Sequence, residues 1–522
     1  MYDSAIQFRP RYLVKGTLTL LSPLHVGDGL TSTERGVSRD DGTKVEVNTV
    51  CVGSDGGAMI PGSTIKGILR AWLKEHRVDG PGVDAVFGAV RGNDPISGGK
   101  AEFCDARLTA KAPPLSEEGH AAKRRNWDHT RGTCVEPRVA IDPRTRTADN
   151  QRLFQLEFVP EGSKFEVTVH ASRMEPAELH LLLGALDAFN DGARLGGEGS
   201  NEWGRVSWDL TSVQWTPPDK VKQWLDNPEE PLPWSDHPEG VAVLHKRAAA
   251  ALPARAGRRR CFLQLTLYFD GAFLINDPTQ ARKMDEPGGP ISFATVRTRD
   301  GRPYVPASSL RGALRSQAAR IWRTVALQHR PPEQHDLLLE AKEARDQEKL
   351  LHFLRLLGAP GWRAPIQIPD FEYLEGGPHP HEFVAIDRFT GGGSEGAKFN
   401  ARALYQPVFR GTIAIDLDRL EDATGQDQWP WLLLAFVLRD LAEGDITIGF
   451  GAGKGYGRVR RTEVTASGLP AAIQPLFRLF PFGRRVENAE LEGSLAGTYD
   501  SLAKRVKAAA LPAHAETQRR GQ

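Results

Sequence analysis

The chain has 522 residues, of which 40% are apolar and 25% are charged, enough apolar material for two or more packed cores. Its net charge of +1 excludes a protein that binds nucleic acid through overall basicity, but leaves room for a local basic track. It contains no apolar run of about 18 residues, and the start "MYDSAIQFRPRYLVKG" lacks the basic-then-apolar pattern of a secretion signal. We therefore expect a folded, soluble, cytoplasmic protein without membrane contacts.

The first half of the chain opens on a predicted strand, because polar and apolar residues alternate in "RYLVKGTLTLLSPLHVG" at 11–27. A helix follows, with Ser63 where an N-cap belongs. Its buried face is predicted by the spacing i, i+3, i+4, i+7, i+8 of Ile65, Ile68, Leu69, Trp72 and Leu73. Lys66 and Arg70, four residues apart, share another face. Further elements are predicted in the order strand, helix, glycine-rich turn and strand, at 164–170, 176–190 and 194–208.

Residues 216–260 are rich in proline and charge and lack sustained periodicity, so we interpret them as a linker with one short helix. The second half then repeats the first. "VAIDPRT" at 139–145 recurs as "VAIDRFT" at 384–390, and Ile60-Pro61 recurs as Val305-Pro306 at the same offset. Two matches at one offset predict a duplication, with domains at 1–215 and 261–465 and a partly helical or disordered tail at 466–522.

The second domain repeats the order of elements of the first. It opens with the alternating strand "CFLQLTLYFDGAFLI", and a later strand, "GTIAIDL", precedes a helix at 429–445. In its first helix Leu310, Ala313, Leu314 and Ile321 are expected to face inward, and Arg311 and Arg315 outward. An α+β protein made of two tandem ferredoxin-like (RRM-like) domains follows from this order of elements.

Four motifs follow one another in the first domain, "LSPLHVGDG", "IPGSTIKGILR", "AIDPRT" and "RLGGEGSNEWGRV", and the second domain has "YVPASSLRGALR", "AIDRFTGG" and "IGFGAGKGYGRV". In this order the motifs resemble the RAMP superfamily of CRISPR-associated proteins. More narrowly, the chain looks like the Csm/Cmr-type backbone subunits of type III effector complexes, with two backbone domains fused as in type III-D. The resemblance implies crRNA, complementary target RNA and other type III effector subunits as partners, and a thumb-type hairpin inserted in each domain, near 109–140 and 364–385.

A glycine inside a helix costs about 1 kcal/mol relative to alanine, so Gly67 and Gly312 indicate a special contact. Close approach of a phosphate backbone is one explanation, and tight packing on the sheet is the other. Together with the resemblance, the basic helix faces, the loop "AAKRRNW" and the glycine-rich turns predict these RNA-binding residues: Ser63, Lys66, Arg70, Lys123, Arg124, Arg125, Gly197, Ser308, Ser309, Arg311, Arg315, Gly451, Gly453, Lys454 and Arg458. Four aromatic residues are candidates either for base stacking or for the core: Tyr12, Trp203, Tyr268 and Tyr456.

In the family, an Asp in the loop before the Pro-Ser helix promotes metal-dependent cutting of target RNA. In the second domain Asp285 is the best match and Asp277 the next. In the first domain Asp40, Asp41 and Glu46 compete, and the family spacing lands on Glu46, which departs from the Asp pattern. A carboxylate there suits a divalent ion, Mg²⁺ or Mn²⁺, and we expect no further metal site.

Four cysteines, Cys51, Cys104, Cys134 and Cys261, lie far apart with no C-x-x-C pair, which argues against a disulfide framework or a four-cysteine zinc site. The irregular spacing of His120, His129 and Cys134 disfavours a structural zinc ion.

Two alternatives to an RNA-cutting subunit remain. The first is a catalytically inactive, structural RNA-binding backbone subunit. The second is a guide-RNA-processing endoribonuclease, which needs a placed His or Tyr general acid-base. His25 has no counterpart in the second domain, where Phe273 or Leu274 falls.

Overall fold

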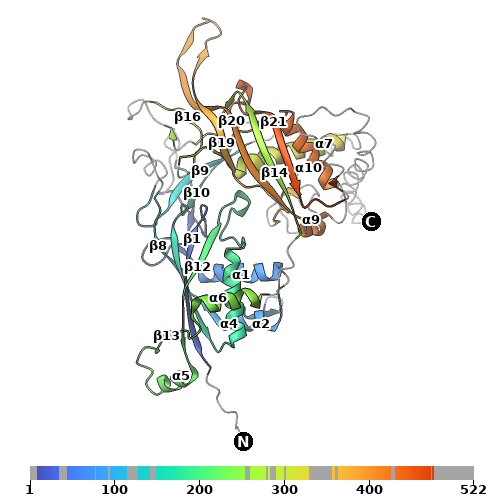
Figure 1. Ribbon diagram of the computed structural model, residues 1–522. Helices are drawn as coiled ribbons and strands as arrows, with labels where there is room; N and C mark the ends of the chain where they lie inside the picture. Colours follow the sequence, from blue (N-terminus) through green and yellow to red (C-terminus); the bar gives the residue numbers. More distant parts are fainter. Residues whose placement is uncertain are drawn as a thin grey trace, which may run out of the picture. The chain divides into compact units, whose positions relative to one another are not determined.

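The computed structural model describes residues 9–34, 44–76, 78–91, 94–113, 127–141, 148–252, 259–277, 280–281, 290–298, 301–327, 356–358, 362–424, 429–471 and 473–474. The chain divides into two compact units, Met1–Gly257 and Arg258–Gln522 (Figure 1). Both units mix α-helices and β-sheets, in keeping with the expected α+β class. None of the helices in the described part of the chain is long and apolar enough to span a membrane.

Unit 1 contains a large sheet with the order β13-β12-β1-β11-β8-β4, in which β7 also pairs with β11, and a second sheet with the order β2-β3-β10-β9. The strands are β1 (Arg11–Leu20), β2 (Gly27–Ser32), β3 (Val47–Val50), β4 (Met59–Ile60), β5 (Ala89–Arg91), β6 (Asp94–Ser97), β7 (Ala101–Phe103), β8 (Ala106–Ala110), β9 (Cys134–Ile141), β10 (Ala148–Phe158), β11 (Lys164–Ser172), β12 (Val206–Thr216) and β13 (Ser235–Asp236). The helices are α1 (Gly62–Glu75), α2 (Pro81–Phe87), α4 (Pro176–Leu186), α5 (Pro218–Leu225) and α6 (Gly240–Ala251).

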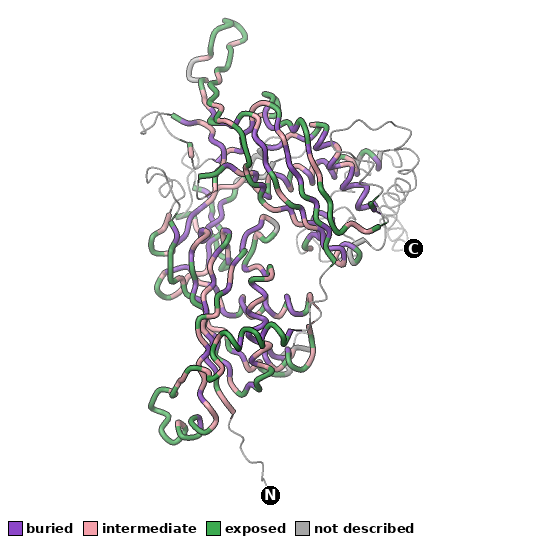
Figure 2. Tube along the Cα trace, in the orientation of Figure 1, coloured by how far each residue is buried: buried purple, intermediate pink, exposed green. Residues whose placement is uncertain are grey.

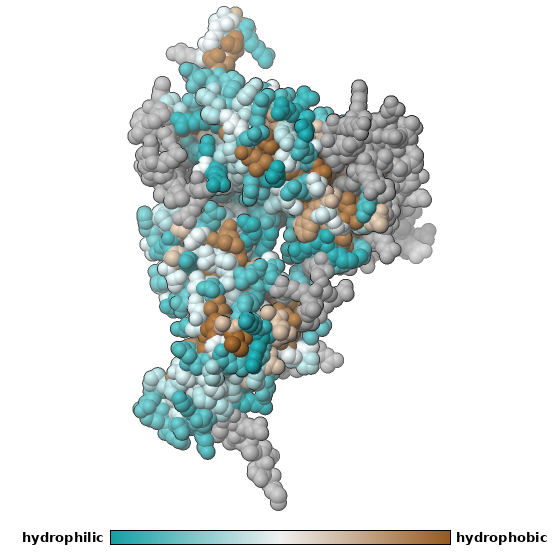
Figure 3. Space-filling view, in the orientation of Figure 1, coloured by the Kyte–Doolittle hydropathy of each residue, from teal (hydrophilic) through white to brown (hydrophobic). Residues whose placement is uncertain are grey.

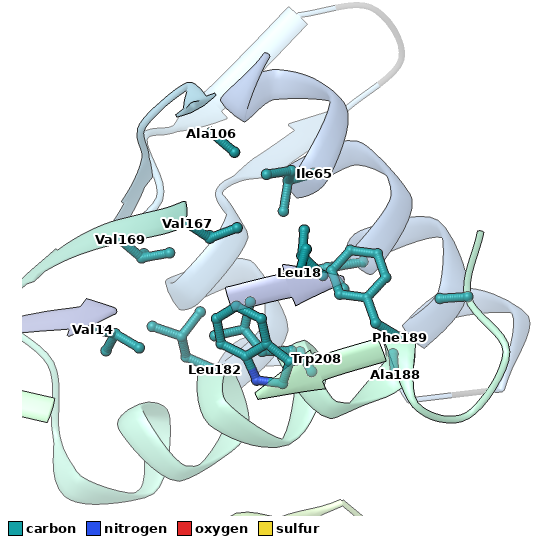
Figure 4. Packing of buried hydrophobic residues seen from close by; sticks show 14 of the residues in the cluster. Val14, Leu18, Ile65, Ala106, Val167, Val169, Leu182, Ala188, Phe189 and Trp208 are labelled. Carbon is teal, nitrogen blue, oxygen red and sulfur yellow. The ribbon is translucent and has the colours of Figure 1, made fainter. Parts of the chain in front are cut away.

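The core of unit 1 lies between the large sheet and the helices α1 and α4, as the periodicity predicted (Figure 4). Four of the five predicted inward residues of α1 are buried, and Ile68 packs against them half-buried. Val14 and Leu18 of β1 point from the sheet into the same cluster. Gly16 lies on β1 where a Cβ atom would come within 2.2 Å of the Trp208 ring, so the strand accepts that ring only because residue 16 has no side chain.

The expected linker 216–260 is instead folded onto unit 1. Strand β13 pairs with β12, and α6 buries Leu244 and Ala248 in the same core as α4. Gly184 of α4 permits this contact, because a Cβ atom there would lie 2.8 Å from the Ala248 carbonyl oxygen. The sequence predicted one short helix in this segment, and its described residues form two, α5 and α6.

Unit 2 contains a sheet with the order β17-β19-β20-β14-β21, and β15, β16 and β18 also pair with β20. The strands are β14 (Arg260–Asp270), β15 (Ala272–Phe273), β16 (Phe293–Ala294), β17 (Tyr304–Val305), β18 (Ile366–Gln367), β19 (Phe371–Ile386), β20 (Gly393–Asp416) and β21 (Arg458–Ser467). The helices are α7 (Ala307–Leu327), α9 (Leu417–Thr424) and α10 (Trp429–Ala442).

The core of unit 2 repeats that of unit 1. Helices α7 and α10 pack together, with the Trp322 and Trp429 rings 5.5 Å apart. Leu310 and Leu314 are buried as predicted. Ile473 is also buried in this core, so the folded part of the unit extends past the predicted boundary at 465.

The two large sheets share one strand order. In unit 1 the strands β12-β1-β11-β8 are neighbours, and in unit 2 the neighbours are β21-β14-β20-β19. In each case the first strand of the unit lies between the strand that follows the glycine-rich turn and the strand that precedes the second core helix. The duplication seen in the sequence is thus repeated in the topology.

Strands β19 and β20 form a long antiparallel hairpin that continues beyond the body of unit 2 (Figure 1). Its outer part is largely exposed (Figure 2), and apolar patches interrupt its hydrophilic surface (Figure 3). The turn lies at 387–392, so "AIDRFTGG" forms the tip and the hairpin reaches beyond the predicted segment 364–385. Phe389 at this tip is 100% exposed.

Candidate nucleic-acid interface

The interior glycines of α1 and α7 lie at exposed positions. No described heavy atom comes within 4 Å of the place where a Cβ atom would be at Gly67 or at Gly312. Packing against the sheet therefore does not explain either glycine within the described residues. Both helices leave open space beside the glycine, which an external molecule can enter.

The basic residues beside these glycines are less uniform than the sequence predicted. Lys66 and Arg70 of α1 are half-buried, and Arg70 is 3.5 Å from Asp84. Arg311 donates weakly to the Ile366 carbonyl oxygen at 3.5 Å. Arg315 was expected to face outward, but it is half-buried and donates to the Gly358 carbonyl oxygen at 3.0 Å. Burial lowers the pKa of the Arg315 guanidinium.

The first backbone N–H group of each helix is bound by a carboxylate of its own unit. The Gly62 N–H donates to Asp105 at 2.9 Å, and the Ala307 N–H donates to Asp370 at 2.7 Å. The expected N-cap Ser63 lies inside α1, because the helix begins at Gly62 and Pro61 occupies the cap position, two residues earlier than expected. Each carboxylate therefore occupies the helix end where the unpaired N–H groups would otherwise favour a phosphate.

Ser63 and Ser308 are exposed, and Ser309 is half-buried. The side chains of both exposed serines therefore reach solvent beside the helix starts. Hydrogen bonding to a phosphate oxygen stays a prediction for these residues.

The two glycine-rich turns are equivalent in their backbone contacts. The Gly197 N–H donates to the His25 carbonyl oxygen at 2.8 Å, and the Phe450 N–H donates to that of Leu274 at 2.7 Å. Gly204 and Gly457, 253 residues apart, both have positive φ and lie directly against a backbone carbonyl. Leu274 therefore holds the place of His25, as the sequence suggested.

The predicted turn residues lie at or near the surface. Gly197, Gly453, Lys454 and Arg458 are exposed, and Gly451 is half-buried. The Lys454 Nζ lies above three aromatic rings of unit 2 at 5.5–5.9 Å from their centroids: Phe383, Phe399 and Phe450. An exposed ammonium of this kind is available to a polyanion.

The structure describes two of the five catalytic candidates. Asp40, Asp41 and Asp285 lie outside the described residues. Glu46 is exposed just before β3, whereas Asp277 is only 6% exposed and accepts a hydrogen bond from Gln280 Nε2 at 3.1 Å. Burial of this kind limits the access of Asp277 to substrate. In the part of the chain that the structure describes, no group of three His, Cys, Asp or Glu residues is placed to hold a metal ion.

The predicted basic loop and the candidate zinc ligands are also only partly covered by the described residues. Lys123, Arg124 and Arg125 lie outside the described residues, as does His120. His129 accepts from Trp127 Nε1 at 3.1 Å, and Cys134 is fully buried, so these two residues are engaged in the local packing of unit 1. The four cysteines are free thiols.

Of the four aromatic candidates for base stacking, Tyr12, Trp203 and Tyr456 are buried. These three pack within their units. Tyr268 is half-buried, with the Arg461 guanidinium 5.0 Å from its ring centroid.

The β19–β20 hairpin carries an aromatic face that was not predicted from the sequence. The His379 and His381 rings are 5.3 Å apart, and the His379 and Tyr405 rings are also 5.3 Å apart. The His381 Nδ1 atom lies 2.7 Å from the Tyr456 hydroxyl. Alternation in "PHPHEF" at 378–383 was the available signal, since residues i and i+2 of a strand share a face.

The fold and this interface define a duplicated α/β protein, in which each copy carries a core helix with an open glycine and a glycine-rich turn. The family model described as the RAMP superfamily matches residues 17–207 and 289–460. Because these two ranges cover more than half of the chain, the protein belongs to the RAMP superfamily. A comparison with curated proteins found no match. Membership supports a CRISPR-associated RNA-binding subunit; the type III branch and the fusion of two backbone domains stay predictions.

Proposed function

We propose that this protein is a crRNA-binding backbone subunit of a type III CRISPR effector complex, of the fused type III-D-like kind, in the cytoplasm. Its two units act as tandem ferredoxin-like (RRM-like) domains, an interpretation supported by their shared strand order. Each domain holds a segment of the guide RNA and its complementary target RNA. Other effector subunits complete the complex.

The observation that carries this proposal is the open glycine in each core helix. Gly67 and Gly312 occupy equivalent positions, 245 residues apart, and both lie beside open space. A glycine inside a helix lowers its stability by about 1 kcal/mol, and close packing within the described residues does not require it here. Close approach of an RNA backbone gives both glycines a reason, because any side chain would hold the ribose and phosphate away from the helix.

The first test is purification of the protein together with its genomic neighbours. The absorbance ratio at 260 and 280 nm reports bound nucleic acid, and sequencing identifies it. RNA of discrete length that carries CRISPR repeat sequence at one end supports the proposal. An intact complex free of RNA refutes it.

Target-RNA cleavage is the catalytic part of the proposal, with Asp285 as the leading residue and Mg²⁺ or Mn²⁺ as the cofactor. Carboxylate oxygens suit such ions, and a bound ion would supply Lewis-acid chemistry at the phosphate. Asp277→Ala is the matched comparison for Asp285→Ala, since Asp277 is buried and partnered. We expect Asp285→Ala to stop cleavage in the second unit. Cleavage that survives at every position in Asp285→Ala, Asp40→Ala, Asp41→Ala and Glu46→Ala would refute the assignment of cleavage to these carboxylates.

A second candidate function, metal-independent RNA cleavage, is favoured by the histidine pair of β19. A neutral histidine accepts the proton of the ribose 2′-hydroxyl while the 2′-oxygen bonds to phosphorus. The P–O5′ bond breaks as the other histidine, protonated, donates a proton to the 5′-oxygen, which leaves a 2′,3′-cyclic phosphate and a 5′-hydroxyl. If His381 Nδ1–H donates to the Tyr456 hydroxyl, its Nε2 atom is left as the base.

Chelation separates this second candidate from the metal-dependent one. Cleavage in excess EDTA that yields a 2′,3′-cyclic phosphate and is lost in His379→Ala and His381→Ala would support it. Loss of all cleavage in EDTA excludes it.

A further inference from the structure

The two glycine-rich turns share a backbone but differ at two positions. Glu198 and Glu202 of unit 1 have φ values of 58° and 63°, and the equivalent positions in unit 2 are Gly451 and Gly455, both at 80°. The offset of 253 residues is the one that relates Gly204 to Gly457. A side chain in the left-handed region is unfavourable, so unit 1 holds two carboxylates where the backbone prefers glycine.

Both carboxylates of unit 1 are engaged by arginines. Arg138 of β9 donates to Glu198 at 2.8 Å, and Arg194 donates to Glu202 at 2.7 Å. The Arg138 guanidinium also lies 4.3 Å from the centroid of the Trp203 ring. Glu202 is only 8% exposed, so little solvent screens its pair. Arg138 and Arg194 are therefore each paired with a carboxylate of the turn, whereas Arg205 of the same turn is exposed.

In unit 1 the cation lies on a strand and the ring on the turn, whereas in unit 2 the cation lies on the turn and the ring on a strand. Phe383 of β19 is the equivalent of Arg138, and the cation is supplied by the turn as Lys454. This ammonium lies above three rings, and among the described residues no carboxylate pairs with it. Its N–H donors are thus free to face solvent, on a turn whose glycines let a ligand come close.

We propose that the glycine-rich turn of unit 2 binds an RNA phosphate through Lys454, and that Glu198 and Glu202 close the equivalent turn of unit 1 to polyanions. The inference rests on the proposed RNA-binding function and adds an asymmetry to it. In unit 1 the Arg138–Glu198 ion pair joins β9 to the turn, and in unit 2 Lys454 of the turn lies over the Phe383 and Phe399 rings of β19 and β20. Of these two contacts, only the one in unit 2 leaves its positive charge without a carboxylate partner among the described residues.

The test measures binding of the full chain to a fluorescein-labelled single-stranded RNA oligonucleotide of mixed sequence, by anisotropy at several salt concentrations. In Lys454→Ala we expect affinity to fall about tenfold, as for a lost charged hydrogen bond. The slope of log K against log salt should become shallower by about 0.7, the value for one phosphate on a single strand.

The opposite change is expected in Glu198→Gln/Glu202→Gln, which removes two negative charges from the turn and leaves Arg138 paired only with Glu136. Its affinity should rise, and its salt slope should steepen by up to about 1.4. Because Glu202 is buried, Glu198→Gln alone serves as the second variant, since Glu198 is half-exposed, and thermal melting verifies that each variant is folded.

Three outcomes decide between the two claims. Wild-type affinity in Lys454→Ala, or no gain in Glu198→Gln, overturns this inference while RNA binding by the wild type leaves the proposed function standing. Absence of RNA binding by the wild type overturns both. Loss in Lys454→Ala together with gain in Glu198→Gln supports the asymmetry.

Discussion

Alanine at Gly67 and Gly312 should make the protein more stable and its RNA binding weaker. Each glycine lies inside a helix with open space at its Cβ position, so alanine fits there without a clash. The substitution should raise the free energy of unfolding by about 1 kcal/mol. For a unit of about 250 residues this corresponds to a rise in melting temperature of about 2–4 °C.

The RNA side of this prediction has the opposite sign. If a phosphate backbone packs against the bare helix, a methyl group forces it away at a cost of about 1–3 kcal/mol. A cost of 1.4 kcal/mol is tenfold in affinity. The assays are thermal melting by circular dichroism and RNA binding by fluorescence anisotropy, on the same protein samples.

Gly184→Ala is the matched control, because this helical glycine lies against the Ala248 carbonyl oxygen. It should lower the melting temperature, in contrast to the other two variants. A lower melting temperature in Gly67→Ala would refute the open geometry. Higher stability with unchanged RNA affinity would refute the close approach of a ligand.

Three further predictions concern contacts within the individual units. Asp105→Ala and Asp370→Ala each remove the acceptor at a helix start and should cost about 1 kcal/mol, seen as a drop in melting temperature; no change would show that solvent serves equally well. Glu157→Gln replaces a fully buried carboxylate, which accepts a hydrogen bond from Thr133 at 2.6 Å, by a neutral amide. The substitution should destabilise unit 1 by about 1–3 kcal/mol in urea unfolding. Hydrogen bonds from two backbone N–H groups hold the pKa of Asp387 below its ordinary 3.8, so the hairpin turn is stabilised above that pH and loses this stabilisation as the pH falls through the lowered value. NMR shifts of the Phe389 and Thr390 amides should report the change, and Asp387→Asn should abolish it.

Periodicity in the sequence was sufficient for the core of each unit. The alternation around Val14 and Leu18 and the helical spacing from Ile65 to Leu73 lead directly to the buried cluster of unit 1. Such patterns are local, and burial follows from them because one face of each element must leave water. The duplication was also legible, since the same spacing recurs with a fixed offset.

The remaining features depend on contacts between distant residues. The acceptor of the α1 start is Asp105, 43 residues further along the chain, so a local N-cap rule selected Ser63 instead. Arg315 lies on the face that the helical pattern assigns to solvent, but a segment at Gly358 covers it. The helix α6 lies in a segment whose proline and charge indicate a linker, so its packing role is evident only when α4 is placed beside it.

Duplication followed by divergence accounts for both the sameness and the difference of the two units. The open helix glycine is present in each copy, although it lowers the stability of an isolated helix. The turns, by contrast, have glutamate in unit 1 at two positions where unit 2 has glycine, on a similar backbone path. A difference that keeps the path and adds negative charge alters what the turn attracts and leaves the fold intact. The two halves of the chain are therefore equivalent as scaffolds, and their proposed difference toward RNA lies in three charged residues of the turns, Glu198, Glu202 and Lys454.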